Sequence, residues 1–197
     1  MSAAILPPVP PQAPRRGSRF WSWLMRGVLR LSGWRLAGEL PDLPRLVVIG
    51  APHSSYWDGV WGLVMKIALD LDINIMIKRE VMDSPLGVIL RPLGLIPINR
   101  KAALNVVGQM AKRFAAHDRM WLGITPEGTR KPVKQWKSGF LRIAREADVP
   151  ILPVFIDYPS KTFTLGAPQH ATGDDDADMA RIRALFRGYR GKYRNTE

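Results

Sequence analysis

The stretch LPRLVVIGAPHSSYWD, residues 43–58, decides the fold. It opens with a short apolar, β-branched run that is entered after Pro41 and Pro44, a pattern typical of a buried strand. This strand would deliver His53 at its end, where α/β sheets place their ligands. The residues that follow, 57–71, have helical character. The stretch therefore predicts a strand that leads directly into a helix.

Strands and helices continue to alternate beyond this unit. Further strands are expected at residues 73–80, 95–98, 120–124 and 149–156, and further helices at 102–117 and 138–147. This alternation predicts an α/β fold, a single layered domain with a central mixed sheet flanked by helices. The chain has 197 residues, of which 46% are hydrophobic, which is enough for one good core and too little for two ordinary domains.

The N-terminal region divides into two parts. Residues 1–14 are rich in proline and are expected to form a disordered arm. Residues 15–37 are expected to form an amphipathic N-terminal helix, with the main domain at 38–197. Neither a secretory signal nor a clean membrane span is indicated, because arginines interrupt the apolar stretch.

The expected N-terminal helix has a purely basic polar face. On a helical wheel, Arg26 and Arg30 fall within about 20° of Arg19, and the apolar side chains occupy the opposite half. No acidic residue precedes Glu39, and three tryptophans lie in this segment. Such a helix is typical of an anionic membrane surface. The alternative is a helix that packs on its own domain.

The charge of the whole chain restricts its partners without identifying them. Lysine and arginine outnumber aspartate and glutamate by 29 to 17, which gives a net charge of +12 and predicts attraction to a polyanion. The absence of cysteine excludes disulfides, zinc-thiolate sites and cysteine nucleophiles. No nucleic-acid recognition motif is present, so nucleic acid is not an expected partner.

The acidic cluster at residues 174–178 lacks the spacing of a calcium-binding loop, and no metal is expected. It would instead start a helix whose basic body runs through 181–194.

Two residues near the first strand could carry out acid–base chemistry. His53 could take a proton from an alcohol that attacks a carbonyl, and Asp58 could hold the other ring nitrogen. A spacing of five does not place both on one face of a regular helix. A loop or helix-start geometry is therefore required, in which Asp58 folds back. The alternative is a helix-capping aspartate near a structural histidine.

Two further motifs could bind an anion. In TPEGTRK, residues 125–131, a glycine turn could present backbone donors, Arg130 could grip an anion, and Glu127 could orient that arginine or contact an acceptor hydroxyl. In GLIPINR, residues 94–100, Arg100 stands at a strand end and suits phosphate. Taken alone, each could also be an ordinary polar surface turn.

Four blocks occur in a fixed order: HSSYWD (53–58), GLIPINR (94–100), PEGTR (126–130) and VPILPVFI (149–156). Together they resemble the glycerophospholipid acyltransferases, specifically the 1-acylglycerol-3-phosphate acyltransferase type. The segments between blocks, including WKSGF at 136–140, are also similar to that family. Residues 38–197 would then form the acyltransferase domain, with residues 15–37 as its interfacial helix.

The resemblance implies a role for each site residue. His53 would be the general base and Asp58 its orienting partner, without an acyl-enzyme. Arg100 would hold the acceptor phosphate together with the loop residues Gly128, Thr129 and Arg130, and Glu127 would position the acceptor. Pro153 would belong to the apolar block that shapes the acyl site.

The resemblance also implies acyl-CoA or acyl carrier protein as co-substrate, no cofactor or metal, and peripheral or monotopic association with the cytoplasmic face of the membrane. The acceptor would be a lysophospholipid such as 1-acylglycerol 3-phosphate. Other acceptors remain open, namely glycerol 3-phosphate, another lysophospholipid or a lyso-aminolipid. A further alternative is a non-catalytic basic module that binds anionic membrane.

Overall fold

The structure is a computed structural model that describes residues 6–85, 87–98 and 103–195. Its centre is a seven-stranded sheet with the strand order β1-β7-β6-β2-β5-β3-β4. The strands are β1 (Arg35–Ala37), β2 (Arg45–Ala51), β3 (Ile73–Lys78), β4 (Leu95–Ile98), β5 (Met120–Ile124), β6 (Ile151–Asp157) and β7 (Thr162–Leu165). All neighbouring strands are parallel except β6 and β7, which are antiparallel. The predicted mixed sheet is confirmed.

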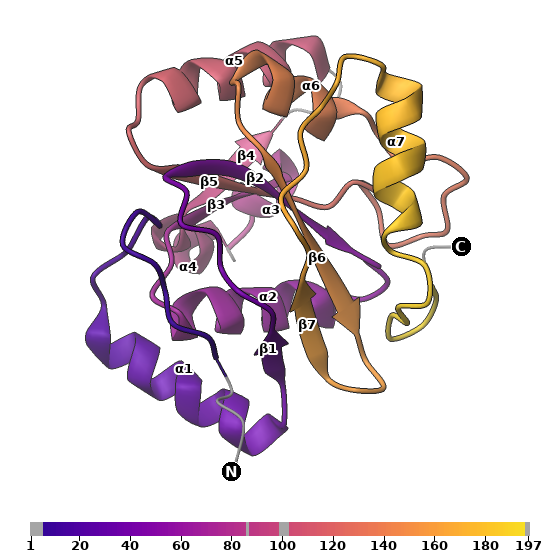
Figure 1. Cartoon of the computed structure of the whole chain (residues 1–197). Helices are drawn as coiled ribbons and strands as arrows, with labels where there is room; N and C mark the ends of the chain where they lie inside the picture. The colour runs from indigo at the N-terminus through magenta and orange to yellow at the C-terminus, as the bar shows by residue number, and fades with distance from the viewer. Residues whose placement is uncertain (1–5, 86, 99–102, 196–197) are drawn as a thin grey trace.

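Helices cover both faces of this sheet (Figure 1). The longer ones are α1 (Arg19–Ser32), α2 (Tyr56–Ala68), α5 (Ala103–Ala115), α6 (Gly139–Glu146) and α7 (Asp175–Ala184), and the short ones are α3 (Arg79–Met82), α4 (Gly87–Leu90) and the 3-10 helix η1 (Arg91–Leu93). Helices α1 and α2 pack on one face, and α5, α6 and α7 pack on the other. Among the described residues, no helix combines the length and the apolar character that spanning a membrane requires.

Strand β2 shows why the layers form. Val47, Ile49 and Ala51 belong to the core under α5 and α6, whereas Leu46 belongs to the core under α1 and α2. This alternation follows from the two-residue period of a strand. Because β2 is covered on both faces, it can be almost wholly apolar.

The N-terminal region differs from the expectation of a disordered arm in the part that is described. Residues 6–14 form an irregular segment with a turn at residues 11–12, but lie against the domain, with Ala13 fully buried. The backbone N–H of Gln12 donates to Asp42 (2.9 Å), and the carbonyl of Pro14 accepts from the backbone N–H of Asp72 (2.8 Å). Proline-rich backbone outside helices and strands keeps its carbonyls available for such partners. Residues 1–5 lie outside the described residues.

Helix α1 is shorter than the segment 15–37 expected to be helical. It starts at Arg19 and ends at Ser32, and the following Gly33 adopts a left-handed conformation (φ 77°) that glycine tolerates without strain. Strand β1 follows almost at once. One side of α1 packs on α2, where the hydroxyl of Ser22 donates to the carbonyl of Ala68 (2.8 Å).

The outward side of α1 is apolar rather than basic. Phe20, Trp21, Trp23, Leu24 and Leu31 are exposed, and Leu31 is 92% exposed. The helix therefore has three sides: one packed on the domain, one apolar and open, and one carrying arginines. The helix therefore packs on its own domain along one side, and the expected contact with a membrane stays a prediction.

The tail also differs from its prediction. Asp174 caps α7 by accepting from the N–H groups of Asp176 and Ala177, so the acidic cluster starts a helix as expected. The helix ends at Ala184, however, and does not continue to residue 194. Gly188 has a φ of 87° and begins an irregular segment. This segment, residues 188–195, is called the C-terminal strap below.

Candidate active site

His53 lies in the short loop between β2 and α2. Strand β2 pairs with β5 and β6 on its two sides, and this pairing fixes where the loop begins. The backbone N–H of His53 donates to Oε1 of Glu127 (2.8 Å), which ties the loop to the end of β5. The imidazole side chain is 16% exposed and lines a partly open cavity. His53 is therefore held at the sheet edge but remains reachable.

Asp58 meets His53 through the geometry of a helix start. Ser55 is the N-cap of α2, and Asp58 is the third helical residue, so the two form a reciprocal capping box. The carboxylate accepts from the backbone N–H groups of Ser54 (2.7 Å) and Ser55 (2.8 Å). The same oxygen, Oδ2, lies 3.2 Å from Nδ1 of His53. The carboxylate therefore caps the helix, and because it also lies next to the imidazole, its role in orienting His53 stays a prediction.

Nδ1 of His53 is buried and, despite its short distance from Oδ2 of Asp58, does not make a regular hydrogen bond. Such loose geometry is common in sites without bound substrate. With Nδ1 turned toward Asp58, the second ring nitrogen, Nε2, is the one that can exchange a proton with a substrate.

Asp58 remains ionised in this surrounding. Burial by itself would raise the pKa of the carboxyl, but hydrogen bonds and charge from His53, Tyr158 and Ser55 outweigh burial and leave the pKa lowered. The Tyr158 hydroxyl donates to Oδ1 at 2.6 Å. Burial, followed by the neighbouring Asp58, raises the pKa of Tyr158, so the phenol stays protonated and keeps donating. Sequence reasoning missed Tyr158, because it lies 100 positions from Asp58 and belongs to no motif.

Glu127 is buried and paired, but with a partner other than the expected one. Oε1 accepts from the His53 backbone, and Oε2 accepts from a guanidinium N–H of Arg194. Its cationic partner is thus Arg194 rather than Arg130. Both carboxylate oxygens are engaged within the protein, so the side chain orients the His53 loop.

Arg194 belongs to the C-terminal strap, which crosses the site. Besides Glu127, its guanidinium donates to the carbonyl of His53 (2.8 Å) and to the carbonyl of Arg130 (3.1 Å). One arginine therefore ties the 53–58 loop to the 126–130 loop. Sequence analysis noted the basic residues of this tail but placed them on a helix, and no local pattern links residue 194 to residue 53.

The anchoring of the strap is extensive. Tyr189 stacks on Phe155, with ring centroids 4.5 Å apart and an interplanar angle of 8°. The backbone N–H of Tyr193 donates to the hydroxyl of Ser54 (3.3 Å). Gly191 passes so close that an added Cβ would lie 2.7 Å from the Ser54 hydroxyl oxygen. The strap is therefore packed against the loop that carries His53.

The PEGTR turn presents an arginine next to this pair. Gly128 has a φ of 65°, and its N–H donates to the carbonyl of Thr125 (3.0 Å), so this amide closes the turn itself. Thr129 accepts from the N–H of Lys131 (3.2 Å). Arg130 is exposed, and its guanidinium lies 3.5 Å from the ring centroid of Tyr56. Arg100 lies outside the described residues.

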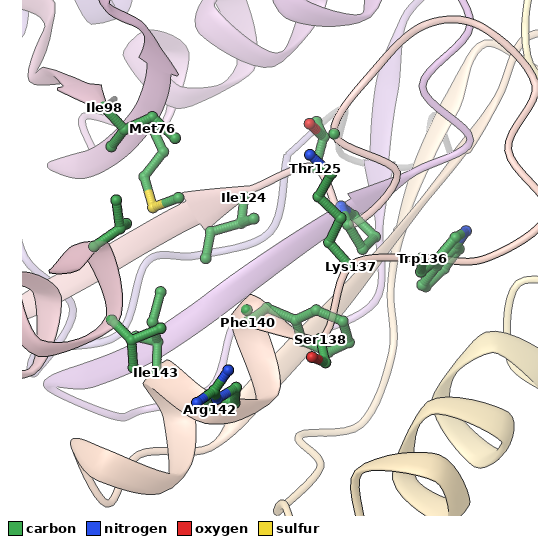
Figure 2. A pocket seen from close by; sticks show the side chains of 15 residues that line it. Met76, Ile98, Ile124, Thr125, Trp136, Lys137, Ser138, Phe140, Arg142 and Ile143 are labelled. Carbon is green, nitrogen blue, oxygen red and sulfur yellow. The ribbon is translucent and has the colours of Figure 1, made fainter. Parts of the chain in front are cut away.

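Two cavities adjoin the site, one on each face of the sheet. The His53 cavity, of about 190 Å³, lies between the sheet and α2. It is lined mainly by apolar side chains, together with Gly59, Gly62 and the polar residues His53, Asp58, Lys66 and Thr125. Pro153 does not line it, although Leu152 and Val154 of the same strand do. The second cavity, here called the α5–α6 groove, has a volume of about 540 Å³. Figure 2 shows this groove between the end of β5 and α6. Met76, Ile124 and Thr125 line both cavities.

Comparison with known proteins gives two matches. A family model described as Acyltransferase matches residues 38–157, which include His53, Asp58 and the PEGTR turn but end before Tyr158 and Arg194. A crystal structure of the 1-acyl-sn-glycerophosphate (LPA) acyltransferase PlsC from Thermotoga maritima has a similar fold, with a TM-score of 0.58, over 84% of this chain and 74% of that chain. The two sequences are 17% identical, so the likeness is one of fold. No curated protein matches the chain by sequence.

Proposed function

This chain belongs to the acyltransferase family, and we propose that it transfers a fatty acyl group from a thioester to the free hydroxyl of a lysophospholipid, namely 1-acylglycerol 3-phosphate. The donor would be acyl-CoA or acyl carrier protein. The observation that carries the proposal is the His53–Asp58 pair, with Nδ1 and Oδ2 3.2 Å apart at the mouth of an apolar cavity.

The chemistry requires one base and no covalent intermediate. Nε2 of His53 takes the proton of the acceptor hydroxyl while its oxygen attacks the thioester carbonyl carbon. A C–O bond forms, the C–S bond breaks, and the departing thiolate recovers the proton from the imidazolium. The ionised Asp58 stabilises that imidazolium and keeps Nε2 free of a proton at the start.

The acceptor phosphate would bind beside this base. Arg130 has no acidic partner within the described part of the chain, and its exposed guanidinium lies over the ring of Tyr56. Guanidinium groups bind phosphate through paired hydrogen bonds. Thr129 and the backbone at Gly128 adjoin it, and Arg100 remains a proposed fourth contributor. The donated acyl chain would enter the His53 cavity, whose walls are mainly apolar.

A lipid acceptor requires access to a membrane. We assign this role to the exposed apolar side of α1, together with Trp57 and Val60 on α2, which are also exposed. Aromatic side chains suit the headgroup region, and the net charge of +12 favours anionic lipid. The proposed location is the cytoplasmic face of the membrane, in a peripheral or monotopic manner.

The test is an acyl-transfer assay with labelled acyl-CoA or acyl carrier protein and a panel of acceptors. The panel contains 1-acylglycerol 3-phosphate, glycerol 3-phosphate, other lysophospholipids and a lyso-aminolipid. His53→Ala should lose at least about 10²-fold in turnover, the usual worth of a general base. His117→Ala is the control, because His117 is exposed and its Nδ1 lies 2.8 Å from the carbonyl of Arg113, far from the site.

Two outcomes would contradict the proposal. Equal turnover by the His53→Ala variant would show that another group is the base. The absence of turnover with every acceptor, combined with vesicle binding that His53→Ala does not affect, would favour the non-catalytic membrane-binding module.

A further inference from the structure

The α5–α6 groove has an apolar floor and a basic wall. Its floor is formed by the apolar side chains of Met76, Ile98, Val106, Ile124, Phe140 and Ile143. Lys137 and Arg142 also line it, and no acidic residue is found among the described residues of the lining. Neither cation pairs with a carboxylate in the part of the chain that is described. The groove therefore suits a molecule that has both an apolar part and a negative charge.

The position of Lys137 places this charge near the PEGTR turn. Its side chain lies across Gly128, since an added Cβ there would be 3.1 Å from Cδ and Cε of Lys137. Its backbone N–H donates to the carbonyl of Pro126 (2.9 Å). Figure 2 shows Lys137 beside Thr125, at the end of the groove away from Met76 and Ile98. The basic end of the groove thus faces the loop that carries Arg130.

The groove and the His53 cavity reach the same place from opposite faces of the sheet. Ile124 and Thr125, at the end of β5, line both. The reaction proposed above joins two lipid molecules, each with its own acyl chain, and its product carries both chains. Two apolar cavities that meet at one strand end match this requirement.

Resting on that proposed function, we infer that the α5–α6 groove binds the acyl chain that the acceptor already carries, and that Lys137 and Arg142 join Arg130 in binding its phosphate. In a lysophospholipid the phosphate and the chain are attached to one glycerol. In an acyl thioester the phosphate lies beyond the whole pantetheine arm. Cations on the wall of the groove itself therefore fit the lysophospholipid. The volume of about 540 Å³ lies within the range of ordinary ligand sites.

The first experiment narrows the groove. Val106→Phe adds a ring to the wall formed by α5, and kinetics are measured with 1-acylglycerol 3-phosphates of increasing chain length. The KM for long-chain acceptors should rise about tenfold or more, as expected when methylene groups are excluded from an apolar pocket. The effect should fade for short chains and for glycerol 3-phosphate, and the donor chain-length profile should stay unchanged.

Val88→Phe is the matched control, because Val88 is exposed on α4 and lines neither cavity. The Val88→Phe variant should leave the KM for every acceptor and the donor chain-length profile unchanged. Thermal unfolding of both variants shows whether the domain is intact. If Val106→Phe does not fold, the same series is run with Arg142→Gln and Lys137→Met, which alter only the wall cations.

The cation variants test the phosphate contact by themselves. Arg142→Gln and Lys137→Met should each raise the KM for 1-acylglycerol 3-phosphate several-fold and leave the KM for a phosphate-free monoacylglycerol unchanged. An equal change for both acceptors would refute the phosphate contact.

Other outcomes separate the groove from the reaction. If Val106→Phe changes the donor chain-length profile and not the acceptor KM, the groove holds the donor chain and the inference is wrong. If neither changes, the groove is not a substrate site. If no acceptor is acylated, the proposed function fails. Binding of labelled 1-acylglycerol 3-phosphate to the intact protein and to Val106→Phe then decides the inference separately.

Discussion

At the scale of single residues, Asp58 combines a structural and a chemical task. It caps α2, accepts from Tyr158 and faces His53. We therefore expect its carboxylate to serve both the stability of the fold and, in the proposed reaction, the orientation of the base.

The variant Asp58→Asn tests the contribution of the ionised carboxylate to stability. Because the folded-state pKa of Asp58 is lowered, the carboxylate stabilises the fold above its ordinary pKa of about 3.9, and this stabilisation is lost as the pH falls through the folded-state pKa. At neutral pH the variant should be less stable by roughly 1–3 kcal/mol, and the difference should shrink below about pH 4. Urea unfolding across this pH range measures it. A difference that does not vary with pH would contradict the ionised state of Asp58.

Arg194 is a second residue whose role can be isolated. Arg194→Ala leaves the carboxylate of Glu127 buried without its cation, which should cost about 3 kcal/mol and lower turnover through displacement of the His53 loop. Arg194→Lys should restore only part of the lost stability and part of the lost turnover, because an ammonium cannot reach all the partners of the guanidinium. Denaturant unfolding and kcat are the measurements.

The double variant Arg194→Ala, Glu127→Gln provides the internal check. Its loss of stability should be smaller than the sum of the two single losses, because the unpaired charge is gone. Arg187→Ala, on an exposed residue before the strap, should change little. Strictly additive losses would show that Arg194 does not act through Glu127.

The residues of the site were predictable only where they share a local motif. His53 and Asp58 lie within one block, and the helix-start geometry that joins them was expected. Tyr158 and Arg194 contact the same site from positions 100 and 141 residues away. Local sequence patterns cannot predict contacts between residues so far apart in the chain, so these contacts are seen only in the three-dimensional fold.

At the scale of elements, α2 supplies both the capping residues and one wall of the His53 cavity. Gly59 and Gly62 line this wall, and a Cβ added at either would have no atom within 4 Å. The glycines therefore leave space where a larger side chain would fill the cavity.

Gly62→Leu should shorten the donor chain that the enzyme accepts. The added side chain can occupy the cavity without moving the backbone, and leucine favours a helix more than glycine does, so stability should not fall. A mixture of acyl-CoA molecules of different lengths, followed by analysis of the product, measures the preference. Gly108→Leu on α5 is the control, since a Cβ there is also unhindered and the residue lines neither cavity. An unchanged preference would place the donor chain elsewhere.

A helix or strand could be predicted from the sequence where its apolar residues form a clear pattern. Strands β2, β3, β4, β5 and β6 are apolar runs and were expected. Strands β1 and β7 were not expected, because these short segments (RLA and TFTL) contain polar residues, whereas the equally short β4 (LIPI) is wholly apolar. The tail was expected to be helical because its basic residues suit a helix, but Gly188 and the contacts of the C-terminal strap prevail over that propensity.

At the scale of the whole molecule, charge and exposed apolar side chains point to an interface. Leu31 and Trp23 are 92% and 70% exposed on α1. The positive net charge would bring the protein to an anionic surface, and these side chains would then insert into it.

Removal of these side chains should weaken vesicle binding. The double variant Trp23→Ser, Leu31→Ser should bind vesicles of mixed neutral and anionic phospholipid at least about tenfold more weakly, because two large apolar side chains are lost. Binding of the unaltered protein should also weaken as salt rises, since surface attraction is screened. Vesicle sedimentation measures both, with Val88→Ser as the exposed control. Undiminished binding by the double variant would exclude this side of α1 as the membrane contact.

The shared wall at the end of β5 has a consequence for how such an enzyme could diversify. Ile124 faces both cavities, so a change there that widened the room for one substrate would alter the room for the other. Selection for a new incoming chain at this position would be constrained by the chain already present on the partner lipid. We therefore expect inherited changes at Ile124 to be accompanied by compensating ones on α2 or α5, where each cavity has a wall of its own.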